Sequence, residues 1–379
     1  MGAADPLQKA LAGFMLGAAG MFATMYSTQA ILPELSRDFD VSPSRAGLSV
    51  SVVVLAVAAG AWAWGPISDR VGRPRAIRAA AWLLVPPTLG VALAPTFELL
   101  LVFRVLQGLC MPGLLVVGAP YVVEAFVPRV GARAMGWWAS ALVLGGLVGR
   151  VGVALAAGVV GWRVAIGALT VLPLCAAISM RDGLPDVPPP VRSGRVLRSL
   201  LRPALLAVTA TGGALFFTFV GTFTYITFRL EEPPFSLDDT TASLVFGLWV
   251  IGVFGPAIGR LAQRTGWRRL AAVSLLLAAV GVSFTVVESI VPVVLGLACL
   301  ATAMFAGYTA TQLGVGDVAR TDRGSASALY FSAYYGSGAL GAYVPGLAWE
   351  SWGWSGVTAL GFSALGLAAA GLLAVRTTS

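Results

Sequence analysis

The chain has 379 residues, of which 58% are hydrophobic and only 11% are charged, and its mean hydropathy is +0.85. Soluble domains carry about 25% charged residues, so this composition excludes a water-soluble globular protein and predicts one that is solvated by lipid. The net charge of +8 does not indicate a nucleic-acid partner. Basic residues in short loops between apolar segments are explained by membrane topology alone.

Apolar segments of the length that spans a bilayer, roughly 20 residues, follow one another along the chain. They cover residues 9–32, 45–65, 76–95, 99–123, 134–158, 162–180, 203–228, 239–259, 270–287, 290–315, 325–346 and 354–375. The sequence therefore predicts an all-α membrane protein with twelve transmembrane helices in two six-helix halves. Residues 1–180 form the N-terminal half, residues 203–379 form the C-terminal half, and residues 181–202 form a cytoplasmic linker rich in proline and arginine.

Most basic residues in the connections fall on one side of the membrane in this arrangement. They follow the even-numbered segments, and examples are Arg70, Arg129, Arg198, Arg268 and Arg323. Because Lys and Arg in short loops stay on the cytoplasmic side, both termini are predicted to be cytoplasmic.

The loops that follow the second and eighth segments are similar. The first reads Gly65-Pro-Ile-Ser-Asp-Arg-Val-Gly-Arg-Pro-Arg75, and the second reads Gly259-Arg-Leu-Ala-Gln-Arg-Thr-Gly-Trp-Arg-Arg269. A second pair, Val130–Ala134 and Arg323–Ser327, lies at the start of the fifth and eleventh segments. Corresponding loops in two halves predict a parallel duplication about an axis normal to the membrane.

These motifs resemble those of one transporter family. Its G-x-x-x-D-R-x-G-R-x-R loop is matched by Gly65, Asp69, Arg70, Gly72, Arg73 and Arg75, and its R-x-x-Q-G motif is matched by Arg104-Val-Leu-Gln-Gly108. The chain is thereby identified as a member of the major facilitator superfamily. The resemblance implies a multi-pass protein of the bacterial inner membrane that works by alternating access, as a monomer.

A narrower resemblance is carried by Gln29-Ala-Ile-Leu-Pro33, Gly149-Arg150 and the segment Ala328–Gly336. These residues are similar to the YnfM-type branch, which is associated with acriflavine sensitivity and lies close to the drug:proton antiporters. The chain departs from those antiporters at Gly145–Arg150, which lacks their helix-five proline. That departure weakens the inference of antiport.

Two arginines lie inside predicted spans, where each charge costs about 2.5–3.5 kcal/mol on insertion scales. Arg104 shares a helical face with Gln107, and both are candidate residues of the substrate cavity. Arg104 either contacts substrate or gates proton coupling, or it bonds backbone carbonyls at a helix break. Arg150 either faces the cavity or braces the interface between the halves. The Gly145 and Gly149 pair beside it predicts close helix packing.

Matched stripes on the first and seventh helices predict a substrate cavity, with interhelical packing as the alternative. Aromatic rings and hydroxyl groups there suit a planar amphipathic molecule. The candidate residues on these stripes are Phe22, Tyr26, Gln29, Thr218, Thr222 and Tyr225. Helices ten and eleven add Tyr308, Gln312, Tyr330 and Tyr334.

The chain has no histidine, and none of its 17 acids falls near the middle of a predicted span. Glu34 and Glu124 come closest and are the candidates for proton coupling, although both also suit solvated carboxylates at span ends. Uncompensated Arg104 and Arg150 would favour an anionic or neutral substrate over a cation. Asp69 is expected to latch the cytoplasmic side by accepting hydrogen bonds near Gly324, with Gly65, Arg70, Gly72, Arg73 and Arg150 as further conformational residues.

The sequence predicts a secondary active transporter that couples proton entry to efflux of small amphipathic compounds. The alternative is a carrier of a small organic anion or sugar. A membrane-embedded enzyme is a remote alternative, because no nucleophile, base and orienter occur together. A P-loop is excluded because the only lysine, Lys9, has no such context. The expected partners are the bilayer, a small substrate and protons, and neither a cofactor nor a metal is expected.

Overall fold

The computed structural model describes residues 6–130, 133–181, 183–187, 202–254, 264–319 and 323–374, and every regular element in these ranges is a helix. Ten helices there are long and apolar enough to cross a membrane. One of them, within α18 (Arg323–Ala374), consists of two helices that meet at the non-helical residue Gly353. With the shorter apolar helix Asp239–Gly252, each of the twelve predicted spans coincides with a helix. The predicted all-α membrane fold is confirmed.

Contacts within the chain divide it into two compact units. The first unit consists of Met1–Phe39 and Val52–Val191, and the second consists of Asp40–Ser51 and Arg192–Ser379. The helix before the predicted linker ends at Ser179, and the next long helix begins at Pro203. Most of the predicted linker, residues 188–201, lies outside the described residues.

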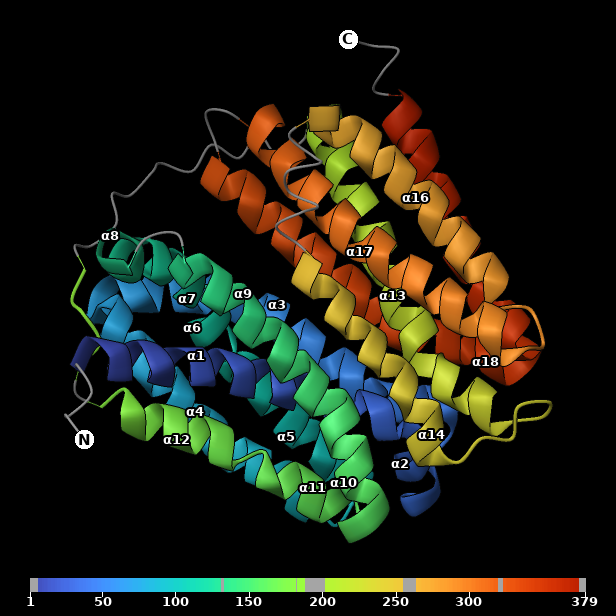
Figure 1. Cartoon of the computed structure of the whole chain (residues 1–379), viewed down its shortest axis with the longest axis horizontal. Helices are drawn as coiled ribbons and strands as arrows, with labels where there is room; N and C mark the ends of the chain where they lie inside the picture. The colour runs from blue at the N-terminus through green and yellow to red at the C-terminus, as the bar shows by residue number, and fades with distance from the viewer. Residues whose placement is uncertain are drawn as a thin grey trace. The chain divides into compact units, whose positions relative to one another are not determined.

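The first unit is a bundle around α1. In Figure 1, α1 runs alongside α9 and α12, and α4 packs against α5, α11 and α12. Its helices are α1 (Pro6–Met25), η1 (Gln29–Ile31), α2 (Leu32–Asp38), α3 (Pro43–Val71), α4 (Arg73–Leu93), α5 (Phe97–Cys110), α6 (Pro112–Leu115), α7 (Gly118–Tyr121), η2 (Val122–Phe126), α8 (Val127–Val130), α9 (Arg133–Leu147), η3 (Val148–Gly152), α10 (Val153–Val160), α11 (Trp162–Ala168) and α12 (Val171–Ser179); the start of α3, up to Ser51, belongs to the second unit.

The second unit is a bundle around α13. The main packing partners are α13 with α18 and α16 with α17, and α17 and α16 also contact α13 (Figure 1). Its helices are α13 (Pro203–Glu231), α14 (Asp239–Ser243), η5 (Leu244–Phe254), α16 (Trp267–Phe284), α17 (Ile290–Val318) and α18.

Glycines with positive φ occur at corresponding positions of the two units. Gly72 (φ 88°, ψ 142°) directly precedes α4, and Gly266 (φ 80°, ψ 146°) directly precedes α16. Gly161 (φ 80°) and Gly353 (φ 56°) each precede a tryptophan that begins a helix. Glycine adopts this conformation without the steric cost that other residues meet. The recurrence supports the duplication that the loop motifs predict.

The loop predicted over residues 65–75 is mostly helical. Helix α3 continues to Val71 and α4 begins at Arg73, so Gly72 alone connects them. The prediction was wrong here because the charged residues Asp69 and Arg70 end the apolar pattern one turn before the helix itself ends.

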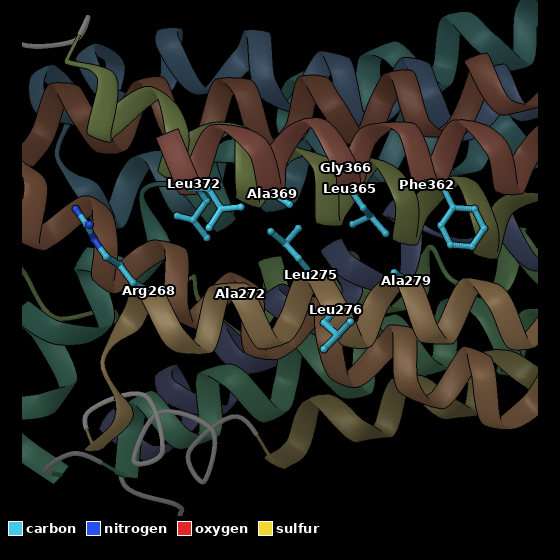
Figure 2. Close-up of a pocket in the computed structure, with 11 residues that line it drawn as sticks. Arg268, Ala272, Leu275, Leu276, Ala279, Phe362, Leu365, Gly366, Ala369 and Leu372 are labelled. Atoms are coloured by element: carbon cyan, nitrogen blue, oxygen red, sulfur yellow. The ribbon is translucent and has the colours of Figure 1, made fainter. Parts of the chain in front are cut away.

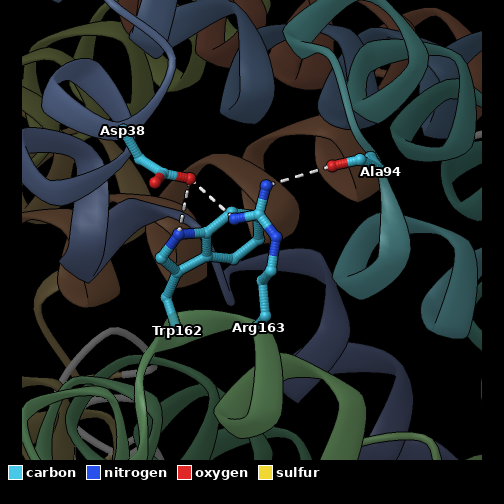
Figure 3. Close-up of polar contacts among 4 residues, drawn as sticks. All are labelled: Asp38, Ala94, Trp162 and Arg163. Atoms are coloured by element: carbon cyan, nitrogen blue, oxygen red, sulfur yellow. Dashed lines mark hydrogen bonds and ion pairs between the residues drawn. The ribbon is translucent and has the colours of Figure 1, made fainter.

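Three connections of the first unit meet at one polar cluster (Figure 3). The Asp38 carboxylate accepts hydrogen bonds from Trp162 Nε1 at 3.2 Å and from Arg163 Nη1 at 2.6 Å. Arg163 Nη2 also donates to the carbonyl oxygen of Ala94 at 3.2 Å. The ion pair is about two-fifths exposed on both sides, so it contributes at most about 1 kcal/mol. Its main effect is to fix the ends of α2, α4 and α11 relative to one another.

The second unit has a similar cluster built on Trp354. The indole Nε1 of Trp354 donates to Thr285 Oγ1 at 3.2 Å, and the Arg229 guanidinium lies 5.2 Å from the Trp354 ring. Arg229 also donates to the carbonyl oxygen of Val286 at 3.0 Å. A tryptophan after a positive-φ glycine therefore ties the same three connections in both units.

Candidate functional site

The first transmembrane segment is interrupted in the middle. Helix α1 ends at Met25, residues 26–28 form a turn, and η1 follows from Gln29. The predicted stripe of Phe22, Tyr26 and Gln29 therefore crosses the break between α1 and η1, and its contact with substrate stays a prediction. The apolar pattern continues through the turn, so nothing in the local sequence marks the break.

Arg104 of α5 satisfies the backbone at this break. Its Nη1 donates to the carbonyl oxygen of Thr24 at 2.7 Å, and its Nη2 donates to that of Met25 at 2.6 Å. The last carbonyls of a helix have no intrahelical donor, and in a bilayer they need another partner. The side chain of Arg104 is completely buried. This geometry matches the helix-break alternative for Arg104.

Gln107, one turn further along α5, orients the arginine. Its Oε1 accepts from Arg104 Nη1 at 2.8 Å, and its Nε2 donates to Thr88 Oγ1 at 3.1 Å. The R-x-x-Q spacing places both side chains on one face of α5, as the sequence predicts. Gln107 therefore acts on Arg104 and α4 in this structure, and its predicted contact with substrate stays a prediction.

Close packing of two helices brings Arg150 to the same region. A side chain at Gly145 would collide with the backbone of Ala19, and one at Gly149 would collide with that of Ala23. The backbones of α9 and η3 therefore lie against α1, which confirms the packing role predicted for this glycine pair. The next residue, Arg150, lies in the π-helical turn η3 and is 1% exposed.

Arg150 contacts the residues that follow the break in α1. Its Nε donates to Gln29 Oε1 at 2.8 Å, and its guanidinium carbon lies 3.7 Å from the centre of the Tyr26 ring. Nη1 donates to the carbonyl oxygen of Gly146 at 3.2 Å. These three contacts orient the guanidinium. Tyr26 in turn contacts Phe22 edge to face, with 5.9 Å between ring centres.

The second unit contains a cluster of stacked aromatic rings between α13, α17 and α18. Tyr334 lies parallel to Phe216, with ring centres 4.1 Å apart and an interplanar angle of 8°. Tyr330 and Tyr308 lie 5.6 Å and 5.5 Å from the Tyr334 ring. Phe216, Tyr308, Tyr330 and Tyr334 are called the aromatic cluster below.

Polar groups hold the tyrosines of the aromatic cluster. Tyr330 Oη lies 2.7 Å from Thr311 Oγ1, and Gln312 Nε2 donates to Tyr308 Oη at 3.1 Å. Tyr330 and Tyr334 are buried, whereas Tyr308 and Gln312 are partly exposed. Of these six residues, Tyr308, Gln312, Tyr330 and Tyr334 were predicted as candidates from helical spacing. Phe216 was missed because its contact with Tyr334 joins residues that are far apart in the sequence.

The predicted stripe on the seventh helix does lie on one continuous helix, α13. Its hydroxyl groups contact other helices of the second unit: Thr218 Oγ1 donates to Gly361 O at 3.4 Å, and Tyr225 Oη donates to Ala342 O at 2.7 Å. Thr222 is also buried. These bonds serve helix packing, and substrate contact by the three residues stays a prediction.

The motif residues at the start of α4 are tied to the fourth transmembrane segment. Arg73 Nη2 lies 3.0 Å from Glu124 Oε1 in the π-helical turn η2. Asp69 and Arg70 are exposed on the last turn of α3, and Glu34 is partly buried in the first turn of α2. The predicted contact of Asp69 near Gly324 would join the two units and stays a prediction. Among the described residues, no group of three or more His, Cys, Asp or Glu side chains could hold a metal ion.

Two helical units whose helices are long and apolar enough to cross a membrane define a multi-pass membrane protein. The model of the Major Facilitator Superfamily matches residues 14–247. The chain belongs to this superfamily and is a secondary membrane transporter, not an enzyme. The bilayer and a small-molecule substrate are therefore its partners.

Known proteins of several bacteria are similar over nearly the whole chain. An uncharacterized transporter of this superfamily from Bacillus subtilis, YybF, is 28% identical over 89% of this chain and 86% of its own. The inner membrane transport protein YnfM of Escherichia coli is 28% identical over 90% of this chain and 84% of its own. The resemblance to the YnfM-type branch is thus confirmed.

Two solved structures share the fold. A bacterial homologue of the human lysosomal transporter Spinster, inward-facing and occupied, gives a TM-score of 0.81 over 100% of this chain and 98% of its own, at 16% identity. The nucleoside transporter NupG gives 0.81 over 96% and 99%, at 13% identity. At these identities the likeness concerns the fold alone.

Proposed function

We propose that this transporter exports small amphipathic compounds that carry an aromatic group, in exchange for protons, across the inner membrane of a bacterium. It works by alternating access as a monomer, with both termini in the cytoplasm. The observation that carries the proposal is the aromatic cluster, in which Tyr334 stacks on Phe216 at 4.1 Å beside two further tyrosines.

The chemistry of the aromatic cluster supports a planar, partly apolar substrate. Aromatic pairs in stacked or edge-to-face contact are stabilised by about 0.5–1.5 kcal/mol beyond the burial of their area. A flat aromatic substrate would extend the stack at its partly exposed member, Tyr308, and the amide of Gln312 would supply a polar contact. Because the aromatic cluster offers few directed polar contacts, it suits compounds that differ from one another in structure.

The ion pair of Arg73 with Glu124 supports a route for proton coupling. Protonation of Glu124 would remove the negative partner of Arg73 and release the connection at Gly72 from the fourth transmembrane segment. A contact that exists in only one protonation state can couple proton binding to the movement of a helix during transport. Glu34 is a second candidate because it is partly buried in the first turn of α2, in the part of the first segment that follows the break.

One observation favours a different substrate, a small organic anion. Arg150 is a buried cation beside the break in the first segment, where it contacts Gln29, Tyr26 and Gly146, and a cation there attracts a carboxylate. A cation at this place would repel a cationic dye. The charge of the substrate therefore distinguishes the two proposals, and the contacts of Arg150 give no comparable support to a sugar.

Equilibrium binding separates these proposals. Fluorescence anisotropy of acriflavine is measured with purified protein, in competition with an aromatic carboxylate such as benzoate. Tyr308→Leu should weaken acriflavine binding about two- to twelvefold, because the ring on which the substrate is proposed to stack is lost. Tyr308→Phe keeps the ring and should bind like the wild type. Displacement by benzoate that is lost in Arg150→Gln, with Tyr308→Leu binding like the wild type, would instead support the organic anion.

A further inference from the structure

An apolar groove lies on the second unit between α16 and the C-terminal part of α18 (Figure 2). Its volume is about 420 Å³, which is within the roughly 300–1,000 Å³ usual for small-molecule sites. Ten of the eleven lining residues are apolar or glycine: Ala272, Leu275, Leu276, Ala279, Phe362, Leu365, Gly366, Ala369, Leu372 and Leu373. Small residues at four of these positions create the hollow.

The remaining lining residue is a cation at one end. Figure 2 shows Arg268 beside Leu372, and Phe362 at the opposite end of the groove. Arg268 is held over the Trp267 ring at 5.2 Å, and Trp267 donates to Asp317 of α17 at 3.2 Å. The guanidinium is partly exposed at the mouth of the groove.

The length of the groove matches one leaflet of a bilayer. It extends along α16 from Arg268 to Ala279, eleven residues that rise about 16 Å in an α-helix. The hydrocarbon core of a bilayer is roughly 30 Å thick, so one leaflet is about 15 Å. The outer wall is open: Leu276 is 67% exposed and Leu373 is 59% exposed. A bound molecule therefore has the dimensions of one acyl chain with a charged end at the membrane surface.

We propose that this groove binds an anionic glycerophospholipid, with one acyl chain along α16 and α18 and the phosphate at Arg268. The charge of Arg268, the one charged residue that lines the groove, complements the phosphate. Basic pockets between transmembrane helices bind anionic headgroups in this way. The proposed lipid site does not depend on the proposed substrate, because no residue that lines the groove belongs to the aromatic cluster.

Native mass spectrometry of the whole protein in detergent tests the proposal, with phosphatidylglycerol and phosphatidylcholine as probes. Wild-type protein should bind phosphatidylglycerol about fivefold more tightly than phosphatidylcholine, the effect of one basic side chain at an anionic surface. Arg268→Gln should remove this preference. Gly366→Leu fills the groove and should weaken both lipids at least fivefold; a side chain there meets nothing within 4 Å, so the fold tolerates it.

Matched variants control for charge and for glycine replacement. Arg269→Gln removes an exposed neighbouring charge outside the groove, and Gly371→Leu adds a side chain in open space on the same helix. Both should bind lipid like the wild type. Equal loss in Arg268→Gln and Arg269→Gln would overturn the proposal, because it would indicate diffuse attraction.

Three other outcomes would also overturn it. Unchanged lipid binding in Gly366→Leu would mean that the groove is not used. Complete displacement of the lipid by glycerol phosphate would indicate a site for a free anion. A protein dimer that Gly366→Leu dissociates would mean that a second copy covers the groove. The comparison of the two lipids on wild-type protein requires no variant, so it stands even if a variant fails to fold.

Discussion

The substitution Arg104→Lys separates a structural role of this buried cation from a role in substrate binding. Arg104 uses two different nitrogens to reach two carbonyl oxygens at the end of α1, at 2.7 Å and 2.6 Å. Lysine keeps the positive charge but has one nitrogen and no fork. It can replace only one of these bonds. The Thr24 carbonyl also accepts from Ser27 Oγ at 3.0 Å, so the carbonyl that can lose its donor is that of Met25.

The expected cost follows from that lost bond. A buried acceptor left unsatisfied costs about 1–3 kcal/mol. For domains of about 150–250 residues, each kcal/mol lowers the melting temperature by about 2–4 °C, so the variant should melt about 2–12 °C below the wild type. The dissociation constant of the substrate should remain within about twofold, because the contacts of Arg104 with Thr24, Met25 and Gln107 are internal to the protein.

Thermal unfolding followed by tryptophan fluorescence gives the first quantity, and equilibrium binding of acriflavine gives the second. Arg150→Lys is the matched comparison, since it conserves charge at the other buried arginine. The reasoning is refuted if Arg104→Lys melts with the wild type while substrate binding weakens more than about tenfold. That result would assign Arg104 to the substrate and would leave the break in α1 held by other groups.

Four further substitutions, one of them a control, probe other parts of the structure. Gly149→Ala should lower the melting temperature, because overpacking costs about 1–3 kcal/mol. The control Gly136→Ala, in open space on α9, should be neutral or stabilising. Equal effects of the two substitutions would contradict the backbone contact of Gly149 with α1. Asp69→Asn should slow transport several-fold in an uptake assay with nearly unchanged substrate affinity, and a large loss of affinity would count against the latch. Asp38→Asn should lower the free energy of unfolding, measured by thermal unfolding, by no more than about 1 kcal/mol, because the ion pair with Arg163 is partly exposed. A larger loss would show that the polar cluster at Asp38 stabilises more than the helix ends it joins.

Features that depend on neighbouring residues were predictable from the sequence. Apolar segments of about 20 residues identify the spans, and the recurrence of Gly72 and Gly266 identifies the duplication. The pair Gly145 and Gly149 identifies close helix packing, because two glycines one turn apart leave a helix surface without side chains.

Features that depend on distant residues were not predictable. The break after Met25 is stabilised by Arg104, which is 79 residues away, and no local residue marks it. The ion pair of Arg73 with Glu124 and the stacking of Phe216 on Tyr334 likewise join separate helices. Helical spacing places side chains on one face, but it does not show which other helix that face meets.

The proposed function is tested most directly by proton flux in proteoliposomes that enclose a pH-sensitive dye, under an imposed pH gradient. Addition of acriflavine should discharge the gradient with wild-type protein, and Glu124→Gln should abolish this flux while acriflavine still binds. The account is contradicted if acriflavine leaves the gradient intact and small carboxylates discharge it in an Arg150-dependent manner.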